Sequence, residues 1–142
     1  MLIAAHEGHA EVLRLLLKGG TDVNQARTDD GTTPLLITTQ EGHTEVASLL
    51  LEGGADVNQA SSDDGTTPLF VASQNDHAEV LSLLLEGGAD VNQATTDSGT
   101  TPLHSATQVG YMEVVSLLLE GGADVNQAKT AEGTMPLFVA AY

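Results

Sequence analysis

The chain has 142 residues, and its 20 acidic side chains against four lysines and arginines give a formal net charge of −16 at pH 7. Because phosphate contacts depend on Lys and Arg, this balance argues against binding to nucleic acid and to anionic membrane surfaces. The lack of cysteine excludes disulfides and cysteine-based zinc sites, and no run approaches the roughly 20 apolar residues that span a bilayer.

The sequence repeats itself with a period of 34 residues, because the motif Thr-Thr-Pro-Leu begins at Thr32, Thr66 and Thr100, with a near copy at Thr134. A second motif, Gly-Gly-Ala-Asp-Val-Asn-Gln-Ala, occupies residues 53–60, 87–94 and 121–128, with one change at 19–26. A period of this size is typical of stacked arrays, in which each unit buries its apolar face only against its neighbours.

We expect one domain over residues 1–142, divided into a truncated unit 1 (residues 1–30), unit 2 (31–64), unit 3 (65–98), unit 4 (99–132) and a partial unit (133–142). Because both ends cut through a unit, we expect a fragment of a longer array. Natural arrays place polar faces on their end units, but Ile3, Ala4, Val139 and Ala140 show no such change. We therefore expect either a monomer that frays over residues 133–142 or weak end-to-end association.

The elements expected in unit 3 are, in chain order, a helix over residues 68–74, a break at 75–77, a second helix over 77–86 and a polar loop over 89–99. Thr67 is a suitable N-cap, and Pro68 occupies the first helical position, where proline is best tolerated. The second helix has a broad apolar face that includes Val80, Leu81 and Leu84. Gly87 and Gly88 end it, one of them with a left-handed backbone.

The pattern Gly-x-Thr-Pro-Leu-x-x-Ala, then Gly-His, then Val-x-x-Leu-Leu-Leu, then Gly-Ala-Asp-Val-Asn closely resembles the ankyrin repeat, over the whole chain. Two departures are visible: each unit has 34 residues instead of the usual 33, and the usual His after Thr-Pro-Leu is kept only as His104. The extra residue falls between Asn58 and Gly65 and lengthens the loop tip. The resemblance implies an all-α fold, a solenoid of stacked helix–turn–helix units with projecting hairpin loops.

The resemblance also implies a non-enzymatic protein-interaction module that binds its partner at the hairpin tips and on the concave first-helix surface. Positions that differ between units are free for such binding, although loops also tolerate change without any function. The runner-up function is a structural spacer or spring without a dedicated partner. The candidate partner-binding residues are Thr32, Gln40, Glu41, Ser61, Ser62, Asp63, Thr66, Val71, Gln74, Asn75, Thr95, Thr96, Asp97, Thr100, Ser105, Gln108 and Val109.

Two explanations remain open for the acidic charge: it keeps the protein soluble, or it attracts a basic partner protein. The candidate residues for a basic partner are Asp63, Asp64, Asp97 and Glu41. The sequence does not name the cellular compartment. The lack of cysteine fits a reducing, intracellular one, although a secreted repeat protein can also lack cysteine.

Other chemistry is not expected. His9, His43 and His77 recur one unit apart, about 10 Å by the thickness of a helix, which is too far for a shared metal, so we expect hydrogen bonds at the helix turn. The side chain of Asn58 is expected to cap its own turn. The alternative that the resemblance implies is a modification site, because Asn58 is similar to ankyrin asparagines that an oxygen-dependent hydroxylase modifies. No nucleophile elbow or calcium loop is present. We therefore expect no enzyme activity, no cofactor and no metal site.

Overall fold

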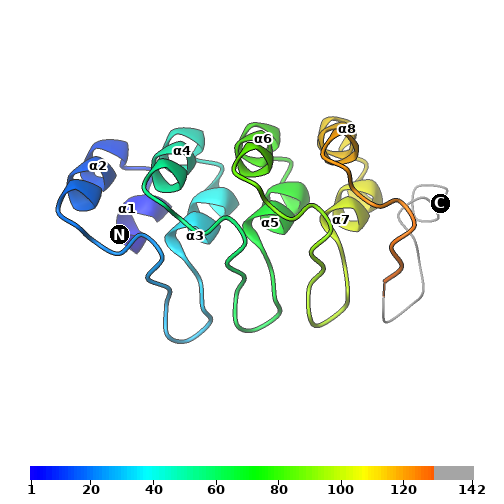
Figure 1. The fold of residues 1–142 in the computed structure, drawn as a ribbon, viewed down its shortest axis with the longest axis horizontal. Coiled ribbons are helices and arrows are strands. Elements are labelled where there is room, and N and C mark those ends of the chain that lie inside the picture. The colour runs from blue at the N-terminus through cyan, green and yellow to red at the C-terminus, as the bar shows by residue number, and fades with distance from the viewer. Residues whose placement is uncertain (130–142) are drawn as a thin grey trace.

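The computed structural model describes residues 1–129 and shows eight α-helices and no strand within them. The helices are α1 (Leu2–His6), α2 (Ala10–Lys18), α3 (Pro34–Glu41), α4 (Thr44–Glu52), α5 (Pro68–Gln74), α6 (Ala78–Glu86), α7 (Pro102–Val109) and α8 (Met112–Glu120). The odd-numbered helices form one row and the even-numbered helices a second row above it, and the long loops that follow α2, α4 and α6 hang below the two rows (Figure 1). This is the all-α stack of helix–turn–helix units that the repeats predict.

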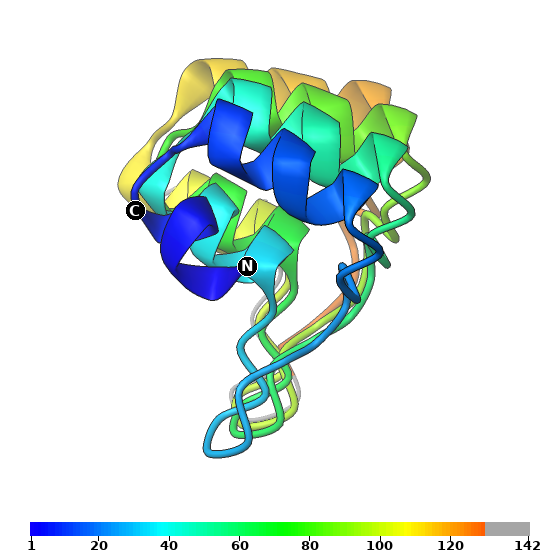
Figure 2. The same cartoon turned by 90° about the vertical axis from the view of Figure 1, so that its left-hand side faces the viewer.

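The two helical layers lie side by side along the whole array, and the loops project away from them on the side of the odd-numbered helices (Figure 2). Each odd-numbered helix contacts the next odd-numbered one, and each even-numbered helix contacts the next even-numbered one. None of the helices in the described part of the chain is long and apolar enough to cross a membrane. The partial unit 133–142, with Val139 and Ala140, lies outside the described residues, so the predicted fraying there stays a prediction.

Helix α5 begins where the sequence predicts, and α3 and α7 begin at the equivalent residues, because a threonine and a proline fix each of these three starts. The hydroxyl of Thr67 accepts a hydrogen bond from the backbone N–H of Phe70 at 3.2 Å, and proline occupies the first turn. Thr33 and Thr101 cap α3 and α7 in the same way. In α7 the N3 side chain, His104, also accepts from the backbone N–H of Thr101 at 3.3 Å and so completes a capping box.

The even-numbered helices differ from the prediction by one residue. In unit 3 the helix begins at Ala78, and His77 is its N-cap without a side-chain capping bond. At its end Gly87 remains near the helical conformation with φ −74°, and Gly88 takes the left-handed conformation with φ +86°. Gly88 is therefore the glycine that provides the predicted left-handed end of the helix.

The core consists of the same positions repeated from unit to unit. Leu69, Val80 and Leu84 are each at most 1% exposed in unit 3, and their counterparts in units 2 and 4 are equally buried. The buried apolar residues of units 1 to 4 belong to a single cluster, so no unit has a closed core of its own.

Polar ladders run beside the apolar core and also join neighbouring units. The side-chain oxygen of Asn58 accepts from the backbone N–H of Asp90 at 2.8 Å, and its amide donates to the carbonyl of Gly88 at 3.4 Å. The turn of unit 2 is instead capped by Asp56, which accepts from the backbone N–H of Asn58 at 2.9 Å. The expectation that Asn58 caps its own turn is therefore wrong, because this side chain spans to the next unit.

The loop tips form a second ladder. The backbone N–H of Ser62 donates to the carbonyl of Asp30 at 2.9 Å, and that of Thr96 donates to the carbonyl of Asp64 at 2.7 Å. Gly65 sits at this contact with φ +72°, and a Cβ there would lie 2.7 Å from Thr96 Cγ2. Neighbouring tips are therefore held against each other, so the side chains that they carry have fixed relative positions.

Candidate partner-binding groove

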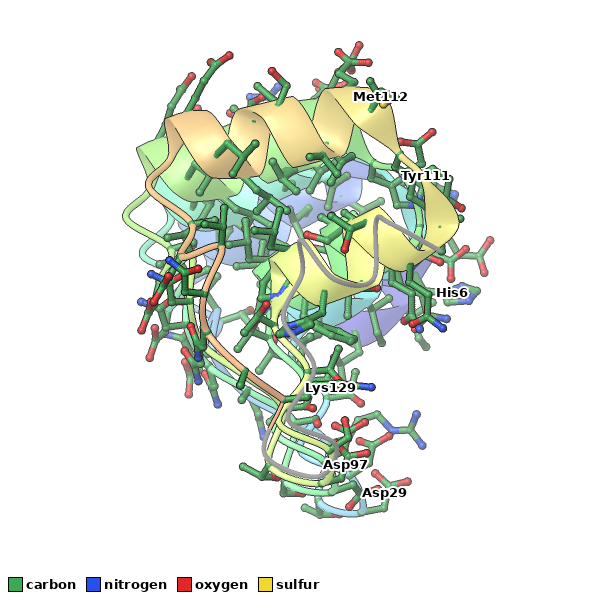
Figure 3. The ribbon with its side chains drawn as sticks, turned by 90° about the vertical axis from the view of Figure 1, so that its right-hand side faces the viewer. His6, Asp29, Asp97, Tyr111, Met112 and Lys129 are labelled. Carbon is green, nitrogen blue, oxygen red and sulfur yellow. The ribbon has the colours of Figure 1, made fainter. Side chains whose placement is uncertain are left out.

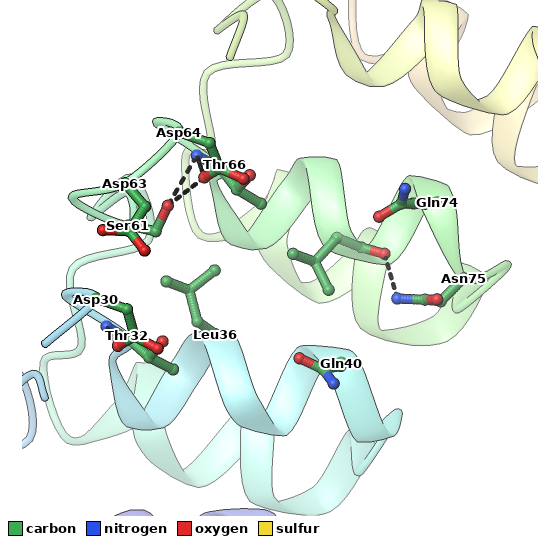
Figure 4. Close-up of a pocket in the computed structure, with 11 residues that line it drawn as sticks. Asp30, Thr32, Leu36, Gln40, Ser61, Asp63, Asp64, Thr66, Gln74 and Asn75 are labelled. Carbon is green, nitrogen blue, oxygen red and sulfur yellow. Dashed lines mark hydrogen bonds between the residues drawn. The ribbon is translucent and has the colours of Figure 1, made fainter. Parts of the chain in front are cut away.

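A groove of about 450 Å³ lies between units 2 and 3, where two loop tips meet the first helices α3 and α5. We call it the 2–3 groove, and Figure 4 shows it with the side chains that line it. Its walls come from both units, so the stacking register sets its shape. The lining residues are Asp30, Thr32, Leu36, Gln40, Ser61, Asp63, Asp64, Thr66, Val71, Gln74 and Asn75.

The loop end of the 2–3 groove carries three carboxylates. Asp64 accepts hydrogen bonds from the Ser61 hydroxyl and from the backbone N–H of Thr66, the latter at 2.9 Å. These bonds, that of the Ser61 hydroxyl first, hold the pKa of Asp64 below its usual value because they favour the charged form. Asp64 therefore closes the loop and also faces the groove.

Asp30 closes the preceding loop in the same way, and it has Arg27 as a basic neighbour. It accepts from the backbone N–H of Thr32 at 2.9 Å, and Arg27 Nη1 lies 3.7 Å from its Oδ2. Hydrogen bonding from Thr32, followed by the smaller contribution of Arg27, lowers the pKa of Asp30. Arg27 itself pairs more closely with Asp29, at 2.6 Å.

The middle of the 2–3 groove is aliphatic, and its far end carries amides. Leu36 on α3 and Val71 on α5 are 5% and 9% exposed. Figure 4 shows Leu36 between the loop carboxylates and the amides of Gln40 and Gln74. Asn75 donates its side-chain amide to the carbonyl of Val71 at 3.0 Å and so closes the end of α5.

The structure brings about half of the predicted site residues together in this groove. Glu41 and Ser62 are exposed beside it, and the rest belong to the next loop and to α7. Those that line the groove are Thr32, Gln40, Ser61, Asp63, Thr66, Val71, Gln74 and Asn75. Those of the next loop and α7 are Thr95, Thr96, Asp97, Thr100, Ser105, Gln108 and Val109.

Not all of these residues are accessible. Thr95 and Ser105 are each 7% exposed. The Thr95 hydroxyl accepts from the backbone N–H of Thr100 at 3.2 Å and lies 3.0 Å from the Ser98 hydroxyl, so it holds the loop together. Asp97 lies at the end of a loop, as does Asp29 (Figure 3). Hydrogen bonds from Thr95 and Ser98 lower the pKa of Asp97.

The list of candidate site residues omits three lining residues, Asp30, Asp64 and Leu36, although Asp64 is among the carboxylates expected to attract a basic partner. The two aspartates recur at one position in consecutive units, so a comparison of the units does not single them out. Leu36 occupies the position of Phe70 in unit 3 and His104 in unit 4. The smaller side chain of Leu36 relative to Phe70 is the signal that could have identified the groove.

Two of the three recurring histidines, His43 and His77, act as the sequence predicts, by hydrogen bonding at the helix turn. His43 Nε2 lies 2.9 Å from the carbonyl oxygen of His6, and His77 Nε2 lies 3.1 Å from that of Gln40. Both bonds connect one unit to the previous one. Within residues 1–129, no three His, Asp or Glu side chains are grouped closely enough to hold a metal ion.

Comparison with known proteins identifies the family. A family model described as ankyrin repeats (3 copies) matches residues 1–95, and one described as ankyrin repeat matches residues 98–130. A comparison with curated proteins found no match to the chain. Because the first model alone covers more than half of the sequence and the fold agrees with it, the chain belongs to the ankyrin repeat family.

Proposed function

We propose that this chain is a non-enzymatic module that binds a partner protein along the loop tips and the exposed first-helix surface, with the 2–3 groove as the main contact. Ankyrin repeats are generally protein–protein interaction modules and generally have no enzyme activity. The groove is the observation that carries the proposal for this particular chain. It combines an aliphatic floor with polar rims, the composition of a protein-binding site.

Differences between the units support this position for the contact. Leu36 and Val71 leave an open volume between α3 and α5, whereas the next pair of first helices has Phe70 and Ser105 at the equivalent positions. Phe70 is only 9% exposed, so a larger side chain is accommodated there. The side chains at the centre of the groove between α3 and α5 therefore differ from those at the equivalent positions of α5 and α7.

The groove can be closed with a side chain that the chain already uses. Leu36→Phe introduces the residue of unit 3 at the matching position of unit 2, so we expect it to fold and to fill the groove. Leu36→Met is the matched control, because it nearly conserves volume. Random peptides displayed on phage are selected against the native protein and then tested against both variants.

The expected result is that selected peptides bind the native protein and Leu36→Met, and lose at least about tenfold in affinity for Leu36→Phe. Equal binding to all three proteins, or no enrichment of any peptide, contradicts the proposal. Either result favours the alternative, a structural spacer without a partner on this surface.

We also propose that the array is a monomer or associates only weakly end to end. Ile3 of α1 and Leu15 of α2 are 80% and 70% exposed, and both belong to the first unit. Sedimentation at increasing concentration measures this association. Ile3→Glu should abolish any association, and a tight dimer that persists in this variant would contradict the proposal.

A further inference from the structure

The loop end of the 2–3 groove is acidic, and Arg27 is a basic neighbour of one of its three carboxylates, Asp30, at 3.7 Å. Asp30, Asp63 and Asp64 line it, and none of its lining residues is Lys or Arg. The sequence contains no Lys or Arg between Arg27 and Lys129, so units 2 and 3 cannot supply one. Their charges are −6 and −5, from six and five acidic residues respectively and no basic ones. The field at the groove therefore favours a cation from outside the chain.

The three carboxylates do not have the same role. Asp64 is engaged by Ser61 and Thr66, and Asp30 is engaged by the backbone of Thr32 and approached by Arg27. Asp63 is exposed and forms no hydrogen bond or ion pair with any other residue of the described part of the chain. Asp63 is therefore the carboxylate that is free to pair with a ligand.

The carboxylates stand next to an aliphatic surface. Leu36 lies beside the loop that carries Ser61 and Asp63 (Figure 4), and Val71 lines the same groove. Lysine and arginine carry a charged head on a long apolar stem, and they bury the stem while the head stays at a polar surface. The apolar floor of the groove suits the stem of such a side chain, and the acidic rim suits its charged head. A short side chain would not reach both surfaces, and an acidic one would be repelled by the rim.

We propose that the 2–3 groove recognises a lysine or arginine side chain of the partner protein, with its stem on Leu36 and Val71 and its cationic head paired with Asp63. This inference rests on the proposed function and names the chemistry that the groove selects. The charge of this chain then contributes to binding, and not only to solubility. Since the pair lies at the rim of the groove, salt should weaken it.

The test reverses one charge at a time. Asp63→Lys changes the groove, and Glu86→Lys makes the same charge change at the exposed end of α6, in the other helical layer. Peptides selected against the native protein should contain Lys or Arg and should lose at least about tenfold in affinity for Asp63→Lys. The control should lose less than about twofold, because distant surface charges are screened. Asp63→Asn, which adds no charge, should give an intermediate loss.

A second selection, against Asp63→Lys, should enrich peptides with Asp or Glu in place of the basic residue. Peptides that Leu36→Phe blocks but that lack Lys and Arg, or that bind Asp63→Lys as well as the native protein, would overturn this inference and leave the proposed function intact. Peptides that are insensitive to Leu36→Phe would overturn both. An equal loss in Asp63→Lys and Glu86→Lys would show attraction by overall charge, and this too would overturn the specific pairing.

Discussion

The imidazole ring of His77 lies directly against Gly42 of the preceding unit. A Cβ atom on Gly42 would stand 2.6 Å from the Cε1 and Nδ1 atoms of this ring, and Nε2 is held 3.1 Å from the carbonyl oxygen of Gln40. His43 sits on Gly8 in the same way. The glycine thus provides both a left-handed turn, with φ +75° at Gly42, and space for the histidine of the next unit.

The first prediction separates these two roles. Gly42→Ala should lower the free energy of unfolding by about 2 kcal/mol or more, because it combines left-handed strain with a clash against the His77 ring. Gly110→Ala is the matched control: Gly110 has φ +90° at the equivalent position, but no atom of residues 1–129 lies within 4 Å of the place that its Cβ would take. In this variant the free energy of unfolding should fall by only about 1 kcal/mol, because left-handed strain is the only cost. Urea unfolding measures both, and equal losses would show that the ring contact contributes nothing.

The second prediction concerns unit 3, where Asp76 occupies the position of this glycine with φ +60°. The side chain of the next unit is here Tyr111 instead of histidine, so the matched pair is replaced at both positions. Asp76→Gly should raise the free energy of unfolding by about 0.5 to 1 kcal/mol, because glycine adopts this conformation without the steric cost.

Asp76→Ala serves as the control for charge. It removes the carboxylate from an acidic protein but keeps a Cβ at positive φ. If the two variants raise the urea midpoint equally, relief of charge repulsion explains the gain, and strain at Asp76 does not.

The helices were predictable from the sequence where short-range chemistry decides them. Thr67 and Pro68 fix the start of α5 through contacts within one turn, and the helix has the predicted bounds. The role of Asn58 was not predictable in this way. Two acceptable partners exist for its side chain, its own turn and the next unit, and only the stacking distance between units selects the second.

The candidate site was predictable in position but not in shape. Unequal residues such as Gln40 and Asp63 indicate which surface varies, and they do line the groove. The groove itself depends on how much space Leu36 leaves beside the side chains of the neighbouring unit. A pattern of residues along the chain does not give this packing. Asp64 shows the other difficulty: the sequence marks it as an acidic residue that could attract a basic partner, but not that its carboxylate also closes the loop.

The third prediction follows from a single buried hydroxyl. Among the described residues, Thr38 Oγ1 on α3 is a buried side-chain oxygen without a hydrogen-bond partner, and the equivalent residues of units 1, 3 and 4 are alanine. Thr38→Val keeps the branched side chain and removes the hydroxyl, so it should raise the free energy of unfolding by about 1 kcal/mol.

Thr39→Val is the control for this prediction, since Thr39 is equally buried but donates its hydroxyl to the carbonyl of Leu35 at 2.8 Å. The free energy of unfolding of Thr39→Val should fall by about 1 kcal/mol, which is the net contribution of such a hydrogen bond. Opposite signs in urea unfolding would support the assignment. A loss in Thr38→Val as large as that in Thr39→Val would instead indicate that the Thr38 hydroxyl is satisfied in solution.

The fourth prediction concerns acid. Asp64 has an unperturbed pKa of 3.8, and hydrogen bonds from Ser61 and Thr66 lower the pKa in the folded state. A depressed folded pKa contributes stability that is complete above the unfolded pKa and is lost as the pH falls through the folded one. Asp64→Ser copies Ser98, whose hydroxyl lies 2.7 Å from that of Thr100 in the next loop, so it should fold normally but lack this titration. Between about pH 7 and about pH 3, the free energy of unfolding of Asp64→Ser should therefore fall by less than that of the native protein. An equal or steeper fall would mean that Asp64 is not a source of the acid sensitivity.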